Sequence, residues 1–157
     1  MNSQQKAYLA GFLDADGSIV LQFRKRDDVR LKYRAKAVVV FYQKENDKKT
    51  LQQLQHLFGH GYVYSRNDNM SEWRIEGHAR VKEFLLQVKP YLRFKKRQAQ
   101  LILTALKILK KHYSANDLLK VCLLANKISG LNNAPRQRKN NYQSVKQDLL
   151  KFGLISL

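Results

Sequence analysis

The sequence predicts a single α+β domain in which helices cover one side of a four-stranded antiparallel sheet. Hydrophobic residues alternate with a period of two in two pairs of segments, and a short polar turn joins each pair, which is typical of β-hairpins. After each pair, hydrophobic residues recur with the period of a helix. One helix precedes the first hairpin and several follow the second. We therefore expect an α-β-β-α-β-β-α core with further C-terminal helices over residues 1–157.

The predicted elements also have local boundary signals. Gly59 follows the second helix and Pro90 follows the third, and Ser114 with Asp117 has the spacing of a capping box ahead of the fifth. Trp73 falls on the hydrophobic side of its strand and is expected in the core. The predicted helices span residues 5–14, 47–58, 79–88, 98–112, 114–129 and 143–152, and the predicted strands span residues 18–23, 32–43, 61–66 and 71–76.

The charge balance predicts the class of partner. Thirty lysines and arginines face 12 aspartates and glutamates, a formal net charge of +18. This excess indicates a polyanion, and nucleic acid is favoured over an anionic membrane surface. No apolar run reaches the roughly 18 residues of a membrane span, and the N-terminal residues lack a signal-peptide pattern. The single cysteine, Cys122, excludes an intrachain disulfide and a zinc finger.

One face of the predicted sheet is basic. Arginine and glutamine match the edges of guanine and adenine in the major groove, and a ten-residue strand spans about 33 Å, close to one turn of B-DNA. A solvated outer face is the alternative, but its acids are mostly confined to Glu72 and Glu76. We expect this face to bind nucleic acid through Gln22, Arg24, Arg26, Arg34, Lys36, Arg66 and Arg74.

The end of the first helix carries a more specific signal. Residues 9–18 read LAGFLDADGS. The last carbonyls of a helix lack partners and its C-terminal end is negative, so the Asp16 carboxylate and the Ala15 carbonyl would offer a hard cation two oxygens. This donor set suits Mg²⁺, with phosphate and water as further ligands. The alternative is an aspartate at a helix end that binds no metal. An EF-hand is excluded, because Ile19 and Lys25 would occupy its glycine and glutamate positions.

Residues 9–18 resemble the motif of the LAGLIDADG homing endonucleases. The order of elements, the Gln43-Lys44 pair and the segment YLRFKKRQA at residues 91–99 are also similar to that family, so the resemblance covers about residues 7–152. It is to the single-motif, homodimeric, intron-encoded branch of chloroplast and mitochondrial genomes. The absence of a transit peptide fits translation inside an organelle, and a bacterial or archaeal source fits as well.

The resemblance implies an activity and a cofactor. The expected enzyme is a Mg²⁺-dependent DNA endonuclease, with Mn²⁺ as a substitute, that cuts both strands of a long pseudo-palindromic site, leaves short 3′ overhangs and promotes intron mobility. Lys95 would stabilise charge at the phosphate or position the nucleophile, and Gln43 would orient the attacking water. Two alternatives are an intron RNA maturase and a non-catalytic DNA binder. The second predicts loss of the acid at Asp16, which is present.

A single motif implies two copies of the chain, because cutting both strands requires two metal sites. Ala7, Ala10 and Gly11 leave one face of the first helix almost bare, so a second helix could approach closely. In a two-fold dimer the two sheets would form a saddle that reads roughly 20 base pairs of double-stranded DNA. The predicted dimer interface comprises Ala7, Ala10, Gly11 and Asp14.

The set of predicted DNA contacts is larger than the basic face. The residues expected to determine the target are Val20, Gln22, Arg24, Arg26, Arg34, Lys36, Val40, Tyr64, Arg66, Glu72 and Arg74. Arg136, Arg138 and Lys139 lie in the polar loop at residues 132–141 and are expected to contact phosphates. Asp47 stands where relatives place a basic residue, so no catalytic role is assigned to it.

Overall fold

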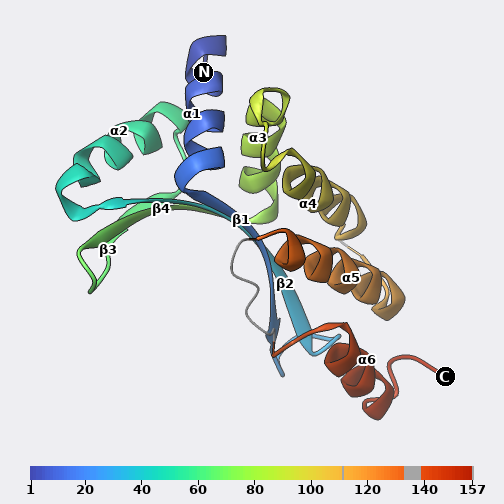
Figure 1. The fold of residues 1–157 in the computed structure, drawn as a ribbon. Coiled ribbons are helices and arrows are strands. Elements are labelled where there is room, and N and C mark those ends of the chain that lie inside the picture. Colours follow the sequence, from blue (N-terminus) through green and yellow to red (C-terminus); the bar gives the residue numbers. More distant parts are fainter. Residues whose placement is uncertain (111, 133–138, 157) are drawn as a thin grey trace. The chain divides into compact units, whose positions relative to one another are not determined.

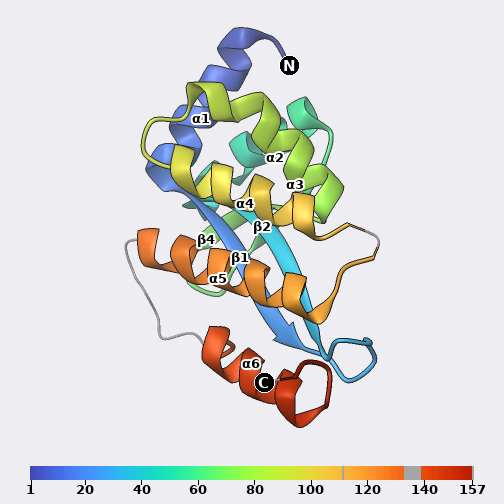
Figure 2. The ribbon, with the colours of Figure 1, turned by 90° about the vertical axis from the view of Figure 1, so that its right-hand side faces the viewer.

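The computed structural model describes residues 1–110, 112–132 and 139–156. The chain divides into two compact units, one formed by residues 1–19 and 37–100 and the other by residues 20–36 and 101–157, apart from the undescribed positions. Each unit contains helices and part of the sheet (Figures 1 and 2). The strands are β1 Gly17–Lys25, β2 Tyr33–Lys44, β3 Tyr62–Ser65 and β4 Met70–Glu76.

The four strands form one sheet in the order β1-β2-β4-β3, so the predicted four-stranded antiparallel sheet is confirmed. The two hairpins join through their inner strands. β2 runs antiparallel to β4 and places Phe41 opposite Trp73 and Gln43 opposite Ser71. β3 also runs antiparallel to β4. Gln43 therefore lies near the end of an inner strand, where main-chain pairing fixes its position.

The first unit contains helices α1 Ser3–Asp16, α2 Lys48–Phe58 and α3 His78–Val88 (Figure 1) and an aromatic core. α1 packs beside α3, and α2 packs on β3 and β4. The rings of Phe41 and Trp73 stack with centroids 4.8 Å apart, and the Phe84 ring meets the edge of Phe41 at 5.8 Å. All three side chains are buried, as expected for Trp73. Two short 3₁₀ helices, η1 Glu45–Asp47 and η2 Lys89–Tyr91, precede α2 and follow α3.

The second unit contains most of helix α4, Lys96–Ile108, together with α5 Ala115–Leu131 and α6 Tyr142–Lys151. α5 and α6 pack against each other (Figure 2). The predicted capping box is confirmed, because the Ser114 hydroxyl accepts the Asp117 N–H group at 3.0 Å and the Asp117 carboxylate accepts the Ser114 N–H group at 3.1 Å. Among the described residues, none of the helices has the length and apolar character needed to cross a membrane.

The observed helix boundaries differ from the predicted ones in two informative places. α1 begins at Ser3 rather than at residue 5, because the Asn2 side chain accepts the Gln5 N–H group and the Gln5 side chain accepts the Asn2 N–H group. It also continues to Asp16. α4 ends at Ile108, four residues before the predicted end. The two additional residues at this end make Asp16 the last residue of α1, which matters for the site below.

Candidate active site and nucleic-acid interface

The C-terminal end of α1 opens directly into β1. Gly17 connects them, and a Cβ atom at this position would lie only 2.9 Å from the Cα and carbonyl oxygen of Leu13. No other residue fits so tight a junction without displacing the main chain. Ala15 and Asp16 are exposed at this junction. Gly17 therefore lets the helix pass directly into β1, with Ala15 and Asp16 at its exposed end.

The segment from Arg93 to Lys95 is fixed to this helix end by Asp14. The Asp14 carboxylate accepts the main-chain N–H groups of Arg93 at 2.7 Å and Lys95 at 2.8 Å. The Lys95 ammonium donates to the Asp14 carbonyl oxygen at 2.5 Å. The sequence predicted Asp14 in a dimer interface, and in the structure both of its carboxylate oxygens accept main-chain groups of the same chain. Asp14 thus holds Lys95 beside the helix end.

Lys95 and Asp16 share one electrostatic environment. Partial burial lowers the pKa of the Lys95 ammonium, and the nearby Asp14 and Asp16 carboxylates act in the opposite direction. The structure thus brings together two of the three predicted catalytic residues. If the exposed Asp16 carboxylate binds a cation and that cation binds an anion, Lys95 can contact the same anion.

The third predicted catalytic residue, Gln43, lies in another part of this unit. It is half-buried and lines a hollow of about 560 Å³ with Asp47 and Thr50, against one face of α1. Neither Gln43 nor Asp47 makes a hydrogen bond to Asp16 within the described chain. Gln43 is therefore adjacent to α1 but is not joined to the carboxylate at its end. The α1 residues that line this hollow are Ala7, Tyr8, Gly11 and Phe12.

The small-residue face of α1 is narrower than predicted. Ala10 is 0% exposed and packs inside its own chain, so it cannot line an open interface as the sequence suggested. Ala7 and Gly11 are exposed, and a Cβ atom at Gly11 would meet nothing within 4 Å. The Tyr8 side chain beside them is 58% exposed. The open face is thus formed by Ala7, Tyr8 and Gly11.

The donor set at the end of α1 suits a hard divalent cation but does not complete its shell. The Asp16 carboxylate and the Ala15 carbonyl are oxygen ligands of the kind that Mg²⁺ and Ca²⁺ take. Within the described residues, no group of three or more His, Cys, Asp or Glu side chains could hold a metal. A cation here would therefore need further oxygens from water, phosphate or a second copy of the chain.

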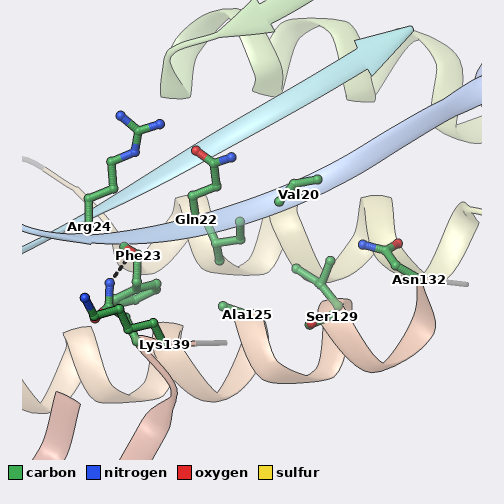
Figure 3. A pocket seen from close by; sticks show the side chains of 11 residues that line it. Val20, Gln22, Phe23, Arg24, Ala125, Ser129, Asn132 and Lys139 are labelled. Carbon is green, nitrogen blue, oxygen red and sulfur yellow. Dashed lines mark hydrogen bonds between the residues drawn. The ribbon is translucent and has the colours of Figure 1, made fainter. Parts of the chain in front are cut away.

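In the second unit, a hollow of about 410 Å³ along β1 is lined by both polar and apolar side chains (Figure 3). Gln22 and Arg24 extend from the same side of the strand, and Lys139 lies near Phe23. Asn140 donates to the Phe23 carbonyl oxygen at 2.8 Å and so ties the end of the 132–141 loop to the strand. Within the described residues, the buried Oε1 atom of Gln22 accepts no hydrogen bond. This amide is an acceptor that a base or a water molecule could satisfy.

In the first unit, the predicted DNA contacts form a network around Glu72. Its carboxylate accepts the Tyr64 hydroxyl at 2.5 Å, Arg66 Nη1 at 2.8 Å and Arg74 Nη1 at 3.2 Å. The hydrogen bond to Glu72 raises the pKa of the Tyr64 hydroxyl. Glu72 lies on the side of β4 that carries Arg74, but it is only 4% exposed, which contradicts the prediction that it contacts DNA. It holds the neighbouring donors in place instead.

Val40 is a second correction on this face, because its side chain is 2% exposed and cannot reach DNA. β2 is an inner strand, and the long Arg74 side chain stands opposite Val40, so a short valine is covered by its neighbours. Arg136 and Arg138 lie outside the described residues. The other predicted contacts are accessible to different degrees: Arg24, Arg26, Arg34, Arg66 and Lys139 are exposed, and Val20, Gln22, Lys36, Tyr64 and Arg74 are half-buried.

Two carboxylates on this face were not predicted from the sequence. Asp28 binds the guanidinium of Arg26, and Asp68 binds that of Arg66. In both cases the acid follows the arginine by two residues in the turn of a hairpin. The pattern Arg-x-Asp at each turn was therefore the signal that could have found them.

The fold and the site define a class: a basic α+β protein that presents a helix-terminal carboxylate beside a lysine. The family model described as LAGLIDADG endonuclease matches residues 9–105. The chain therefore belongs to the LAGLIDADG endonuclease family.

Similar proteins cover nearly the whole chain. It is 35% identical over 149 residues to DNA endonuclease I-CvuI of Chlorella vulgaris, a match that spans 95% of this chain and 92% of that protein. It is 30% identical to DNA endonuclease I-CreI of Chlamydomonas reinhardtii, over 92% of this chain and 88% of that protein. The crystal structure of I-CvuI with the I-CreI target in 2 mM Mg, in which the DNA is not cleaved, aligns with a TM-score of 0.92 over 98% of this chain and 97% of that chain, at 33% identity.

Proposed function

We propose that this protein is a site-specific, divalent-metal-dependent DNA endonuclease that acts as a homodimer on a long pseudo-palindromic duplex and promotes intron mobility. The observation that carries the proposal is the arrangement at the end of α1, where Asp16 is exposed and Asp14 holds Lys95 beside it. Membership of the LAGLIDADG endonuclease family supports the activity. The crystal structures of I-CvuI with DNA in Mg or Ca support the use of a divalent metal.

The residues at the helix end would divide the work of phosphodiester hydrolysis. Asp16 and the Ala15 carbonyl would hold Mg²⁺ against the scissile phosphate. When bound, the metal supplies an activated water molecule and stabilises the leaving 3′ oxygen. Lys95 places a positive charge next to the phosphate, where it stabilises the negative charge that develops there. Gln43, an amide that both donates and accepts, would orient the attacking water.

The homodimer follows from the need for two such sites. Each chain provides one Asp16, and hydrolysis of both strands requires two. Ala7 and Gly11 leave a face on α1 where a second helix could pack closely, with Tyr8 exposed beside it. Phe94 is 84% exposed between the two residues whose N–H groups Asp14 accepts. An aromatic side chain so exposed on a fixed main chain is typical of an interface.

Target recognition would rest on the basic face of the sheet. The Gln22 amide, the Arg24 guanidinium and the arginines around Glu72 provide donors and acceptors of the kind that read base edges. Lys139 would contact phosphate, and so would Arg136 and Arg138. Two copies of this face would read roughly 20 base pairs.

The experiment that tests this function is double-strand cleavage of a library of pseudo-palindromic duplexes, with Mg²⁺ or with EDTA. We expect a narrow set of cleaved sites, with 3′ overhangs, that disappears in EDTA and with Asp16→Asn. Asp27→Asn is the matched control, because it removes an exposed carboxylate that has no side-chain partner within the described residues. Tight binding of one duplex with no metal-dependent cut would overturn the catalytic proposal and favour a DNA-binding or RNA-splicing role.

A further inference from the structure

Arg26 and Asp28 form a two-point ion pair in the turn that follows β1. Arg26 Nε donates to Asp28 Oδ1 at 2.8 Å, and Arg26 Nη2 donates to Asp28 Oδ2 at 2.6 Å. The hydrogen bond to Arg26 lowers the pKa of the Asp28 carboxyl. Two parallel hydrogen bonds fix the plane of the guanidinium as well as its position. The arginine therefore has a defined orientation although both side chains are exposed.

The ion pair uses only one edge of the guanidinium. Its Nε and Nη2 atoms face Asp28, and within the part of the chain that the structure describes no acceptor contacts Nη1. The second edge, formed by Nη1 and the remaining hydrogen of Nη2, is therefore available. Guanine presents O6 and N7 to such a pair of donors in the major groove. Asp28 orients the arginine without occupying the edge that would read a base.

The second hairpin has a related ion pair, but there Asp68 binds one nitrogen only, and Arg66 Nη1 donates to Glu72 Oε1 at 2.8 Å. Arg66 follows β3, and its Nη2 atom donates to Asp68 Oδ2 at 2.8 Å, again two residues later in the turn. An acid in these turns opposes the attraction between DNA and a chain of net charge +18. These carboxylates weaken the general attraction to DNA, so a contribution to DNA affinity does not explain them. Because they orient two arginines, a contribution to the choice of target sequence does.

We propose that Asp28 is a specificity-determining residue. It holds Arg26 so that the outer edge of the guanidinium reads one base pair in each half-site, and it makes this guanidinium less available to phosphates of other sequences. The inference rests on the proposed function, because it requires that the basic face bind DNA. Asp28 acts through Arg26 and is a positioning residue rather than a DNA contact. In the second hairpin Arg66 is also held by carboxylates, those of Asp68 and Glu72, but its Nη1 and Nη2 atoms are both engaged.

The adjacent residue provides a matched control. Asp27 and Asp28 are both exposed in the same turn, but within the described residues the Asp27 side chain has no partner. Asp27→Asn and Asp28→Asn change the net charge equally, and only the second disrupts the orientation of Arg26. The Asp27 carbonyl, which accepts Lys32 Nζ at 3.0 Å, is retained in both variants. A role in general electrostatics predicts the same result for the two, whereas positioning predicts different results.

The test is selection of bound duplexes from a randomised library in Ca²⁺, with sequencing of the bound fraction, for the wild type, Asp27→Asn, Asp28→Asn and Arg26→Ala. Binding rather than cleavage is read out, so a failure of catalysis does not obscure the result. We expect Asp28→Asn to reduce the preference for the best base about three- to tenfold at one position per half-site, and only there. Arg26→Ala should affect the same position, and Asp27→Asn should leave the profile unchanged. Thermal unfolding of the four proteins provides the check on folding.

Each other outcome has a separate meaning. If Asp27→Asn and Asp28→Asn give the same profile while Arg26→Ala changes one position, Arg26 reads a base without help from Asp28 and the inference is overturned. An unchanged profile for Arg26→Ala overturns it as well and removes Arg26 from the interface. If the wild type selects no duplex, the proposed function itself fails, and with it the inference.

Discussion

The Asp14 carbonyl accepts a hydrogen bond from the Lys95 ammonium at 2.5 Å, and the Asp14 carboxylate accepts the main-chain N–H group of the same lysine at 2.8 Å. One residue in the last turn of α1 thus holds both the main chain and the side chain of Lys95. Asp16, the proposed metal ligand, lies two residues further along the helix. The position of Lys95 relative to the metal site therefore depends on Asp14.

Removing the Asp14 carboxylate should slow cleavage without weakening DNA binding. In Asp14→Ala the N–H groups of Arg93 and Lys95 lose their acceptor, so Lys95 shifts relative to Asp16. A displacement of about 1 Å costs roughly 100-fold in rate when it misplaces a catalytic group. We expect single-turnover cleavage to fall about 10- to 100-fold while affinity measured in Ca²⁺ changes little.

Asp14→Asn is the graded control for this prediction, because its amide has one acceptor and can satisfy only one of the two N–H groups. Its cleavage rate should fall between those of the wild type and Asp14→Ala. A loss of DNA affinity equal to the loss of rate would instead place Asp14 in the DNA or dimer interface.

Gly11→Leu should separate folding from dimerisation. A Cβ atom at Gly11 meets nothing within 4 Å of its own chain, and leucine favours a helix over glycine by up to about 1 kcal/mol. The protomer should therefore remain folded, with an unchanged or higher Tm. The added side chain blocks close approach by a second α1. We expect analytical ultracentrifugation to show a monomer and double-strand cleavage to disappear.

Gly130→Leu provides the comparison, since Gly130 is also an exposed helical glycine with open space around it. It should keep both the dimer and the activity. A Gly11→Leu variant that remains dimeric and active would exclude this face of α1 from the interface.

Glu72→Gln should destabilise the protein and broaden its target preference. The carboxylate accepts three donors, from Tyr64, Arg66 and Arg74, whereas an amide has one acceptor and turns its own donors toward the arginines. Leaving buried donors unsatisfied costs about 1–3 kcal/mol. We expect the free energy of unfolding in urea to fall by about this amount, and base preference to weaken in the half-site region that Arg66 contacts.

Glu76→Gln makes the same charge change on the same strand, but the Glu76 carboxylate is more exposed, and its ion pair is with Arg74 Nε at 3.2 Å. It should cost less stability than Glu72→Gln. Equal effects of the two substitutions would show that net charge, rather than the network around Glu72, determines the result.

The residues that the sequence placed correctly are those whose partners lie within a few positions. Asp117 is three residues from Ser114, and the alternation that buries Trp73 is visible in the strand itself. Asp14 and Lys95 are 81 residues apart, so no local pattern shows that one holds the other. Val40 is likewise paired with Arg74, which belongs to another hairpin. Contacts of this kind depend on how distant elements meet in the fold, and the resemblance to a family indicated the order of elements but not the side-chain partners.

The stability of the second unit should depend on pH through Asp148. Its carboxylate on α6 accepts Lys25 Nζ at 2.5 Å and the Tyr33 hydroxyl at 2.6 Å, which lowers its pKa below the ordinary value of 3.8. Because its pKa is lowered in the folded state, the Asp148 carboxylate contributes its full stabilisation above the ordinary value of 3.8. This contribution is lost as the pH falls through the folded pKa. Asp148→Asn should therefore cost about 1 kcal/mol at pH 7, a modest figure because Lys25 is exposed. Urea unfolding between pH 7 and pH 2.5 should show that the stability advantage of the wild type over Asp148→Asn shrinks below about pH 4. An advantage that persists at the lowest pH would mean that packing of α6, rather than the charge of Asp148, is responsible.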